Sequence, residues 1–80
     1  MNKKKHRISF VVPAYNEENN IRRFYEETNR TVRSLDNYTW EFIFIDDGSN
    51  DLTWHVIKEL SGLDSTVKGL RLSRNFGKEM

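Results

Sequence analysis

The chain has 80 residues and a net charge of +1 at pH 7, with 36% hydrophobic and 31% charged side chains. These values fit one small globular domain with a modest core and argue against a disordered segment. The near-neutral charge gives no general attraction to nucleic acid, so we expect no nucleic-acid partner. The chain lacks cysteine, which excludes disulfides, zinc-thiolate sites and cysteine nucleophiles. Its longest apolar run, residues 42–45, is too short to cross a membrane.

The first seven residues, MNKKKHR, form a basic tail. No hydrophobic signal-peptide segment follows them, and strand-like residues come instead. A solvated tail is one interpretation; a weak contact with anionic lipid is the other, since each clustered Lys or Arg contributes about 1 kcal/mol near such a surface. We therefore divide the chain into a tail, residues 1–7, and a domain, residues 8–80.

The domain opens with a strand and a helix. Residues 8–12 are apolar and β-branched, which predicts a buried strand, and Pro13 is expected to end it because proline cannot donate to the ladder. The apolar period then becomes helical over residues 18–35, with Asn16 or a neighbour as the cap.

Two further strands and one more helix follow. Residues 40–45 and 67–72 predict strands. Between them, an apolar stripe at helical spacing predicts a helix; it consists of Leu52, Val56, Leu60 and Leu63, with Ile57 beside it. Helices between buried strands indicate right-handed crossovers and a parallel sheet. The second strand is apolar on both faces, which implies cover on both sides. The predicted class is α/β, with a three-layer, mostly parallel β-α-β-α-β sheet that forms half of a doubly wound domain.

Ligands of open parallel sheets bind at the carboxyl ends of the strands. Three polar or glycine-bearing segments fall there: residues 13–18, 46–49 and 73–77. Neither G-x-G-x-x-G nor the P-loop pattern occurs, and proline and acid replace the glycines that cradle a pyrophosphate. Such a loop suits a nucleoside better, with a tyrosine ring against the base and carboxylates near base N–H or ribose hydroxyl groups.

Asp46 and Asp47 are adjacent at a strand end, so their side chains point to opposite faces and are not expected to chelate one metal ion together. One can accept hydrogen bonds from a ligand while the other ties down the turn. The alternative is that both are only turn and cap residues. Tyr15 and Glu17 also have simpler interpretations, as a half-buried aromatic and as a residue of the first helical turn.

Two sequence segments resemble the opening of inverting family 2 glycosyltransferases: residues 11–18, VVPAYNEE, and residues 43–51, IFIDDGSND. A third, residues 72–79 with the sequence LSRNFGKE, is similar to the subgroup that transfers a sugar to a polyprenyl phosphate. That subgroup includes dolichol-phosphate mannosyltransferase and bactoprenol glucosyltransferases. The resemblance covers nearly all of the chain from Ile8 onward.

The resemblance implies the N-terminal half of a nucleotide-diphospho-sugar transferase fold, with a nucleotide-diphosphate sugar as donor and Mg²⁺ or Mn²⁺ in the full-length enzyme. It implies that the nucleoside pocket is lined by Pro13, Tyr15, Glu17, Ile45 and Asp47. It gives a supporting role to Asn16, Asp46, Gly48 and Ser49.

The family pattern also has parts that are missing from this sequence. Its metal-binding D-x-D follows a fourth strand, and its catalytic base lies further on, so we expect no catalytic residue and no bound metal in these 80 residues. The parent is expected to be a hexosyltransferase with a lipid-phosphate acceptor, in the cytoplasm or held to the cytoplasmic face of a membrane by C-terminal segments. We expect the chain alone to be a truncated, inactive piece.

Two alternatives use the same scaffold. A sugar nucleotidyltransferase usually carries a glycine- and arginine-rich loop after the first strand, which residues 13–16 do not provide. A non-catalytic binding or assembly module is the other. Without a fourth strand, one edge of the first strand is expected to be unpaired, and exposed edges pair with other chains. We therefore predict self-association through that edge.

Overall fold

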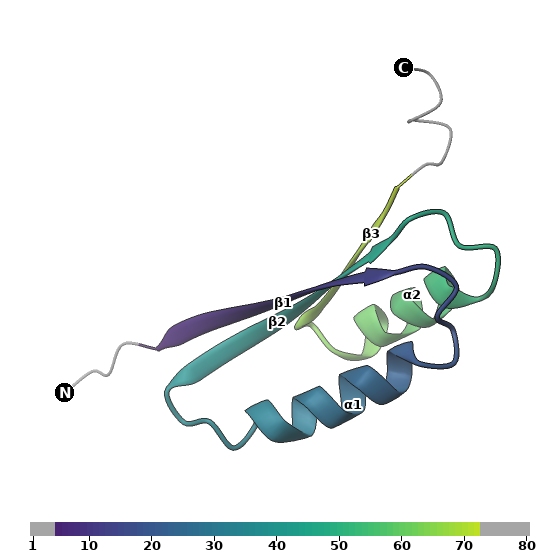
Figure 1. Ribbon diagram of the computed structural model, residues 1–80. Helices are drawn as coiled ribbons and strands as arrows, with labels where there is room; N and C mark the ends of the chain where they lie inside the picture. Colours follow the sequence, from purple (N-terminus) through teal and green to yellow (C-terminus); the bar gives the residue numbers. More distant parts are fainter. Residues whose placement is uncertain (1–4, 73–80) are drawn as a thin grey trace.

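The computed structural model describes residues 5–72, which form one parallel sheet and two helices (Figure 1). The elements are β1 (His6–Ala14), α1 (Ile21–Val32), β2 (Tyr38–Asp46), α2 (Thr53–Leu63) and β3 (Val67–Arg71). The predicted β-α-β-α-β order is confirmed. None of the helices in this part of the chain is long and apolar enough to span a bilayer.

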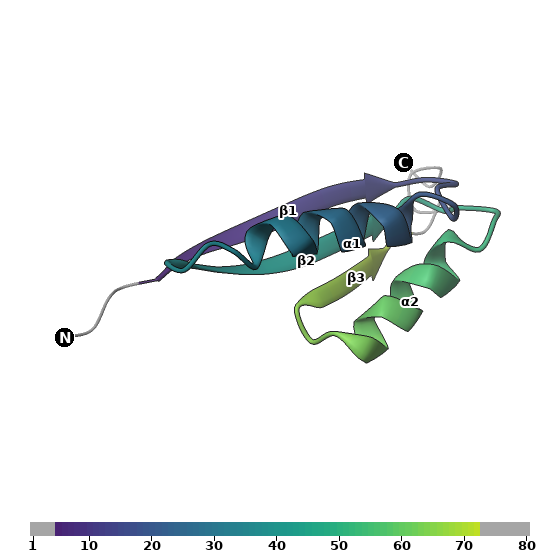
Figure 2. The ribbon, with the colours of Figure 1, turned by 90° about the horizontal axis from the view of Figure 1, so that it is seen from below.

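The sheet has the strand order β1-β2-β3, and both neighbouring pairs are parallel. Its register aligns Phe10 with Phe42 and Phe42 with Val67. Both crossovers move across the sheet in the same direction, so right-handed connections place both helices on one face, as Figures 1 and 2 show. Residues 5–72 therefore form two layers, and the third layer of our prediction needs a cover that these residues do not supply.

The core lies between the sheet and the two helices and is centred on Phe42 and Phe44, which are fully buried. Phe10 stacks on Phe42 with ring centroids 5.3 Å apart, and Tyr25 of α1 meets Phe42 at 5.2 Å. Such aromatic pairs add about 0.5–1.5 kcal/mol to the free energy gained from area burial. The buried cluster consists of Ala14, Ile21, Phe42, Phe44, Ile57, Leu60 and Val67.

Helix α2 packs through a different stripe from the one predicted. Ile57 is fully buried at its centre, whereas Leu63 is 78% exposed. The reason is a close approach to β3 at Gly69, where an added Cβ would lie 2.6 Å from Cγ2 of Ile57. The missing side chain at Gly69 lets the helix settle on the strand, and this rotates Ile57 into the core.

The predicted ends of β1 and α1 were wrong. Strand β1 continues through Pro13, because β1 pairs only with β2 among the described residues and the proline nitrogen can face the unpaired side, where no ladder bond is lost. Helix α1 begins at Ile21 instead of residue 18, and its N-cap, Asn20, makes no side-chain capping bond. Residues 15–20 form a separate loop, in which the amides of Asn20 and Ile21 donate to the carbonyl of Glu17.

Candidate functional site

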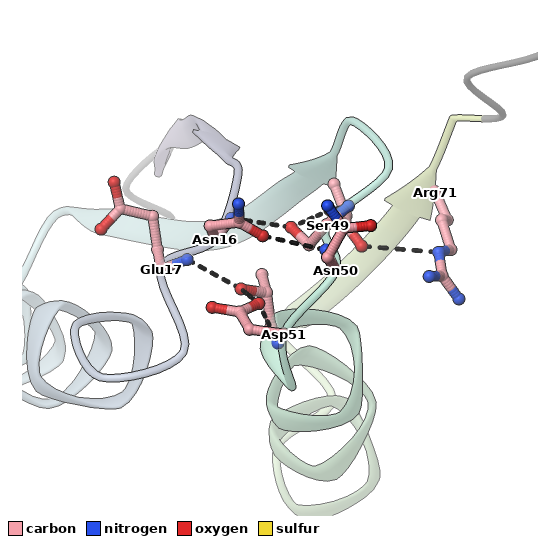
Figure 3. Close-up of polar contacts among 8 residues, drawn as sticks. Asn16, Glu17, Ser49, Asn50, Asp51 and Arg71 are labelled. Atoms are coloured by element: carbon pink, nitrogen blue, oxygen red, sulfur yellow. Dashed lines mark hydrogen bonds and ion pairs between the residues drawn. The ribbon is translucent and has the colours of Figure 1, made fainter.

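Two loops meet at the carboxyl edge of the sheet (Figure 3). Residues 15–20 follow β1, and residues 47–52 follow β2. Five hydrogen bonds join residues 16–18 to residues 49–53 across this edge. The third predicted segment, residues 73–77, lies outside the described residues.

Asn16 connects the two loops with both its backbone and its side chain. Its amide donates to Oγ of Ser49 at 2.8 Å, and its Oδ1 accepts from the amide of Asn50 at 2.9 Å. Asn16 has a φ of 53°, in the left-handed region that asparagine adopts more readily than most residues. Of the expected caps for α1, Asn16 or a neighbour, Asn16 is not the cap, because its side chain is used between the loops.

The next two residues strengthen this connection. The amide of Glu17 donates to Oγ1 of Thr53 at 2.8 Å, and the amide of Glu18 donates to Oδ2 of Asp51 at 3.3 Å. In return, Oε1 of Glu18 accepts from the amide of Leu52 at 2.9 Å. Burial alone would raise the pKa of Asp51, but hydrogen bonds from the hydroxyl and amide of Thr53 and from the amide of Glu18 outweigh it and lower that pKa.

Asp46 holds the turn after β2 from inside. Its side chain is fully buried, and its Oδ1 accepts from both the amide and the hydroxyl of Ser49, at 2.9 and 2.5 Å. Gly48 completes the turn with a φ of 78°, which favours glycine. The geometry gives Asp46 the turn-fixing role that the sequence allowed for one of the two adjacent acids.

The side chains of Tyr15, Glu17 and Asp47 remain exposed at the same edge. None of the described residues donates a hydrogen bond to the carboxylate of Asp47. Glu17 accepts a bond from Nδ2 of Asn20 at 2.9 Å, and its carboxylate points away from the 47–52 loop (Figure 3). The polar groups of this edge thus fall into two sets: the groups that join the two loops, and the carboxylates of Glu17 and Asp47, which do not.

Pro13 and Ile45 complete the set that the resemblance assigned to the nucleoside. They are register partners on β1 and β2, so they lie side by side at the end of the sheet. Pro13 and Glu17 also border an open hollow of about 230 Å³, whose other lining residues are Val12, Asn20, Ile21, Phe24 and Phe44. The structure therefore brings Pro13 close to both Ile45 and Glu17, at the start of α1.

The described residues do not fit a divalent metal ion. Residues 5–72 hold no group of three or more histidine, aspartate or glutamate side chains placed to share one. Asp46 and Asp47 do not form a pair, because Asp46 is buried against Ser49 while Asp47 is exposed. The Mg²⁺ or Mn²⁺ implied by the resemblance has no ligand set in this part of the chain.

Sequence reasoning missed several residues that build this edge. Asp51 and Thr53 were not singled out, although aspartate side chains commonly accept a hydrogen bond from the backbone amide two residues further on. The roles of Glu18 and Arg71 could not be predicted from local sequence, because their partners lie more than 20 residues away and the fold alone brings them together.

Residues 9–79 match the profile described as "Glycosyl transferase family 2". This match covers most of the chain and places both loops of the carboxyl edge inside the family pattern. The chain belongs to glycosyl transferase family 2. The resemblance drawn from the two loop motifs is therefore confirmed.

Relatives from bacteria and a protist support this assignment. The chain is 47% identical over 73 residues to the "Prophage bactoprenol glucosyl transferase homolog" of Escherichia coli, a match that covers 91% of the chain and 24% of the relative. It is 42% identical to the "Putative glycosyltransferase CsbB" of Bacillus subtilis, over 90% of the chain and 22% of the relative. It is 39% identical to the "Dolichyl-phosphate beta-glucosyltransferase ALG5D" of Trichomonas vaginalis, over 89% of the chain and 23% of the relative. The chain thus spans about a quarter of the length of these relatives.

Proposed function

We propose that this chain is the nucleoside-binding part of an inverting glycosyltransferase, which moves a sugar from a nucleotide-diphosphate donor to a polyprenyl phosphate. Two of the relatives are named for bactoprenol and dolichyl-phosphate glucosyl transfer, which supports a lipid-phosphate acceptor. The third sequence motif, residues 72–79, supports the same subgroup.

One observation carries the proposal: at the carboxyl edge, the carboxylate of Asp47 is exposed and takes no part in the hydrogen bonds that join the loops. Asn16, Glu18 and Asp51 are occupied by loop-to-loop hydrogen bonds. The carboxylate of Asp47 and the ring of Tyr15 are exposed on this fixed frame. A nucleoside needs such an arrangement, because an oriented carboxylate can accept from a base N–H or a ribose hydroxyl while an aromatic ring packs against the base.

In the whole protein, an oxygen of the lipid phosphate attacks the anomeric carbon of the donor. A new carbon–oxygen bond forms on one side while the bond to the nucleoside diphosphate breaks on the other, so the configuration inverts. The residues described here supply donor positioning. We place the ligands of Mg²⁺ or Mn²⁺ outside residues 5–72, and we place the reaction at the cytoplasmic face of the membrane that holds the lipid, where the donor is available.

Titration of the ¹⁵N-labelled chain with UDP, GDP and UMP tests this function by NMR. We expect amide shifts to concentrate in residues 13–18 and 45–49. D47A removes a hydrogen-bond acceptor and is expected to weaken binding roughly tenfold. Y15A removes a stacking platform and is expected to weaken binding by a similar or larger factor, since stacking on one base contributes about 1–3 kcal/mol.

Matched controls come from the opposite end of the sheet. Asp36 is an exposed aspartate in the turn between α1 and β2, and Tyr38, which is 38% exposed against 42% for Tyr15, begins β2. D36A and Y38A are expected to leave the titration unchanged. Nucleotide shifts that are indifferent to D47A and Y15A, or equally sensitive to D36A and Y38A, would contradict the assignment.

We further propose that the chain self-associates through the outer edge of β1. Among the described residues β1 pairs on one side only, and Val11 on this strand is 58% exposed. A nine-residue strand with one unpaired edge is a template for another chain. Sedimentation over a wide concentration range is expected to show association that V11K reduces, since edge lysines oppose pairing. A stable monomer at every concentration would contradict this proposal.

A further inference from the structure

The two carboxylate oxygens of Asp46 have unequal surroundings. Oδ1 accepts two hydrogen bonds from Ser49. Oδ2 is buried and accepts none from the described residues. Within residues 5–72, the guanidinium of Arg71 forms an ion pair with Oδ2, with Nε at 3.5 Å. A fully buried carboxylate is costly unless a charge of opposite sign compensates it, and Arg71 supplies that charge beside Asp46.

The strand register and one contact from α2 place the guanidinium of Arg71, whose side chain is 48% exposed. The sheet register places Arg71 of β3 directly beside Asp46 of β2. From α2, the indole of Trp54 faces the guanidinium, with Cζ 5.7 Å from the ring centroid. Trp54 can lie there because Gly69 has no side chain; an added Cβ would be 3.2 Å from the ring. Strand β3, helix α2 and the turn after β2 therefore meet at one charged group.

The effect of this group reaches the loop after β1. Asp46 orients Ser49, and the hydroxyl of Ser49, which donates to Asp46, accepts from the amide of Asn16. A continuous path of contacts thus joins Arg71, on the outer strand β3, to Asn16, in the loop after the other outer strand, β1. In Figure 3 the guanidinium of Arg71 lies on the far side of Ser49 from Asn16, at the opposite end of this path. Asn16 is flanked by Tyr15 and Glu17, which belong to the proposed nucleoside site.

We infer that Arg71 is a positioning residue for the nucleoside site: by compensating Asp46, it holds Ser49 and, through Ser49, the backbone that presents Tyr15, Glu17 and Asp47. Arg71 acts through Asp46 and is not assigned a contact with the nucleotide. This inference rests on the proposed function for its consequence in binding, whereas the structural coupling can be measured without any ligand.

The planar guanidinium explains why arginine stands here. It can direct Nε toward a carboxylate while its face packs on an indole, and an ammonium group cannot do both. R71K is therefore expected to keep the charge but lose the orientation, and to give an effect between those of the unaltered chain and R71Q.

The experiment compares the unaltered chain with R71Q, R71K and the double variant D46N/R71Q. In R71Q we expect the amide signals of Ser49 and Asn16 to shift and nucleotide affinity to fall roughly tenfold, as for groups coupled through one network. D46N/R71Q is expected to return both readouts toward the unaltered values, because two neutral amides can satisfy each other. R22Q is the control: it removes the exposed Arg22–Glu59 ion pair, away from this path, and is expected to change neither.

Two results would overturn the inference: a folded R71Q whose Ser49 and Asn16 signals are unchanged, or a double variant that is no better than R71Q. If R71Q fails to fold, D46N must restore folding, and its failure to do so overturns the inference as well. Absence of nucleotide binding by the unaltered chain would count against the proposed function alone, since the Ser49 and Asn16 signals still decide the coupling.

Discussion

Acidic side chains occur at both ends of the sheet, but their partners differ. Toward the amino end, Glu41 lies on the helix-free face and accepts from Arg7 at 2.9 Å, Ser9 at 2.5 Å and Lys68 at 3.0 Å. At the carboxyl edge, Asp46 and Asp51 accept mainly from backbone amides and hydroxyls of the loops. The first arrangement neutralises charge among side chains, whereas the second fixes the course of the backbone.

The two arrangements differ in how well they can present an acid to a ligand. Hydrogen bonds to backbone groups determine loop conformation directly, so the loops of the carboxyl edge are held without the help of Asp47. Its carboxylate is left for another partner. Toward the amino end, the carboxylate of Glu41 already accepts hydrogen bonds from three side chains, so it is less available to a ligand than that of Asp47.

The largest effect on folding is expected from D46A. It leaves the amide and hydroxyl of Ser49 and the guanidinium of Arg71 without their partner inside the fold. Each of the two Ser49 donors, which are buried, is left unsatisfied at about 1–3 kcal/mol, a large part of the stability of a domain this small. Urea unfolding followed by circular dichroism measures the loss. D36A, at an exposed aspartate, is the control, and equal midpoints for the two variants would refute the structural role of Asp46.

A smaller loss is expected from D51A. The change removes the acceptor of the Thr53 and Glu18 amides, which begin α2 and join the loops. Leaving such groups unsatisfied costs about 1–3 kcal/mol, visible as a lower unfolding midpoint. E59A provides the comparison, because it removes only an exposed ion pair with Arg22, for which about 0–1 kcal/mol is typical. A D51A midpoint no lower than that of E59A would mean that the loop-to-loop bonds contribute little.

Acid unfolding probes the amino end separately. Hydrogen bonds from Arg7, Ser9 and Lys68 lower the pKa of Glu41 from 4.5 to about 2. A carboxylate with a lowered pKa stabilises the fold above its ordinary pKa, and this contribution disappears as the pH falls from about 4.5 to about 2. Thermal unfolding between pH 6 and pH 2 is therefore expected to show a smaller decrease in Tm for E41Q than for the unaltered chain. Parallel Tm profiles would contradict the lowered pKa.

The smallest effect on stability is expected from D47A. Exposed substitutions away from special features usually change stability by less than about 0.5 kcal/mol, and no described residue donates to this carboxylate. Urea midpoints of D47A and the unaltered chain are expected to agree. A large decrease would place Asp47 among the groups that hold the loops and would remove the distinction between the two sets.

The sequence predicted the element order and the sheet edge well, because both depend on local periodicity and on the rule for parallel sheets. It placed Asp46 and Asp47 on different sides for the correct reason, the alternation of side chains along a strand. The sequence did not reveal the role of Asn16, because asparagine is suited both to capping a helix and to bonding between two loops. Arg71 could not be found, because its pairing with Asp46 exists only once the register of β2 and β3 is fixed. Local chemistry was readable in the sequence, and pairings across the sheet were not.

The most direct test of the division between loop-holding and ligand-facing acids is the nucleotide titration of D47A, carried out beside its unfolding curve. We expect an unchanged urea midpoint together with a roughly tenfold loss of affinity, the size of one lost hydrogen bond. A D47A chain that binds nucleotide as well as the unaltered chain, or that unfolds as readily as D46A, would contradict this expectation.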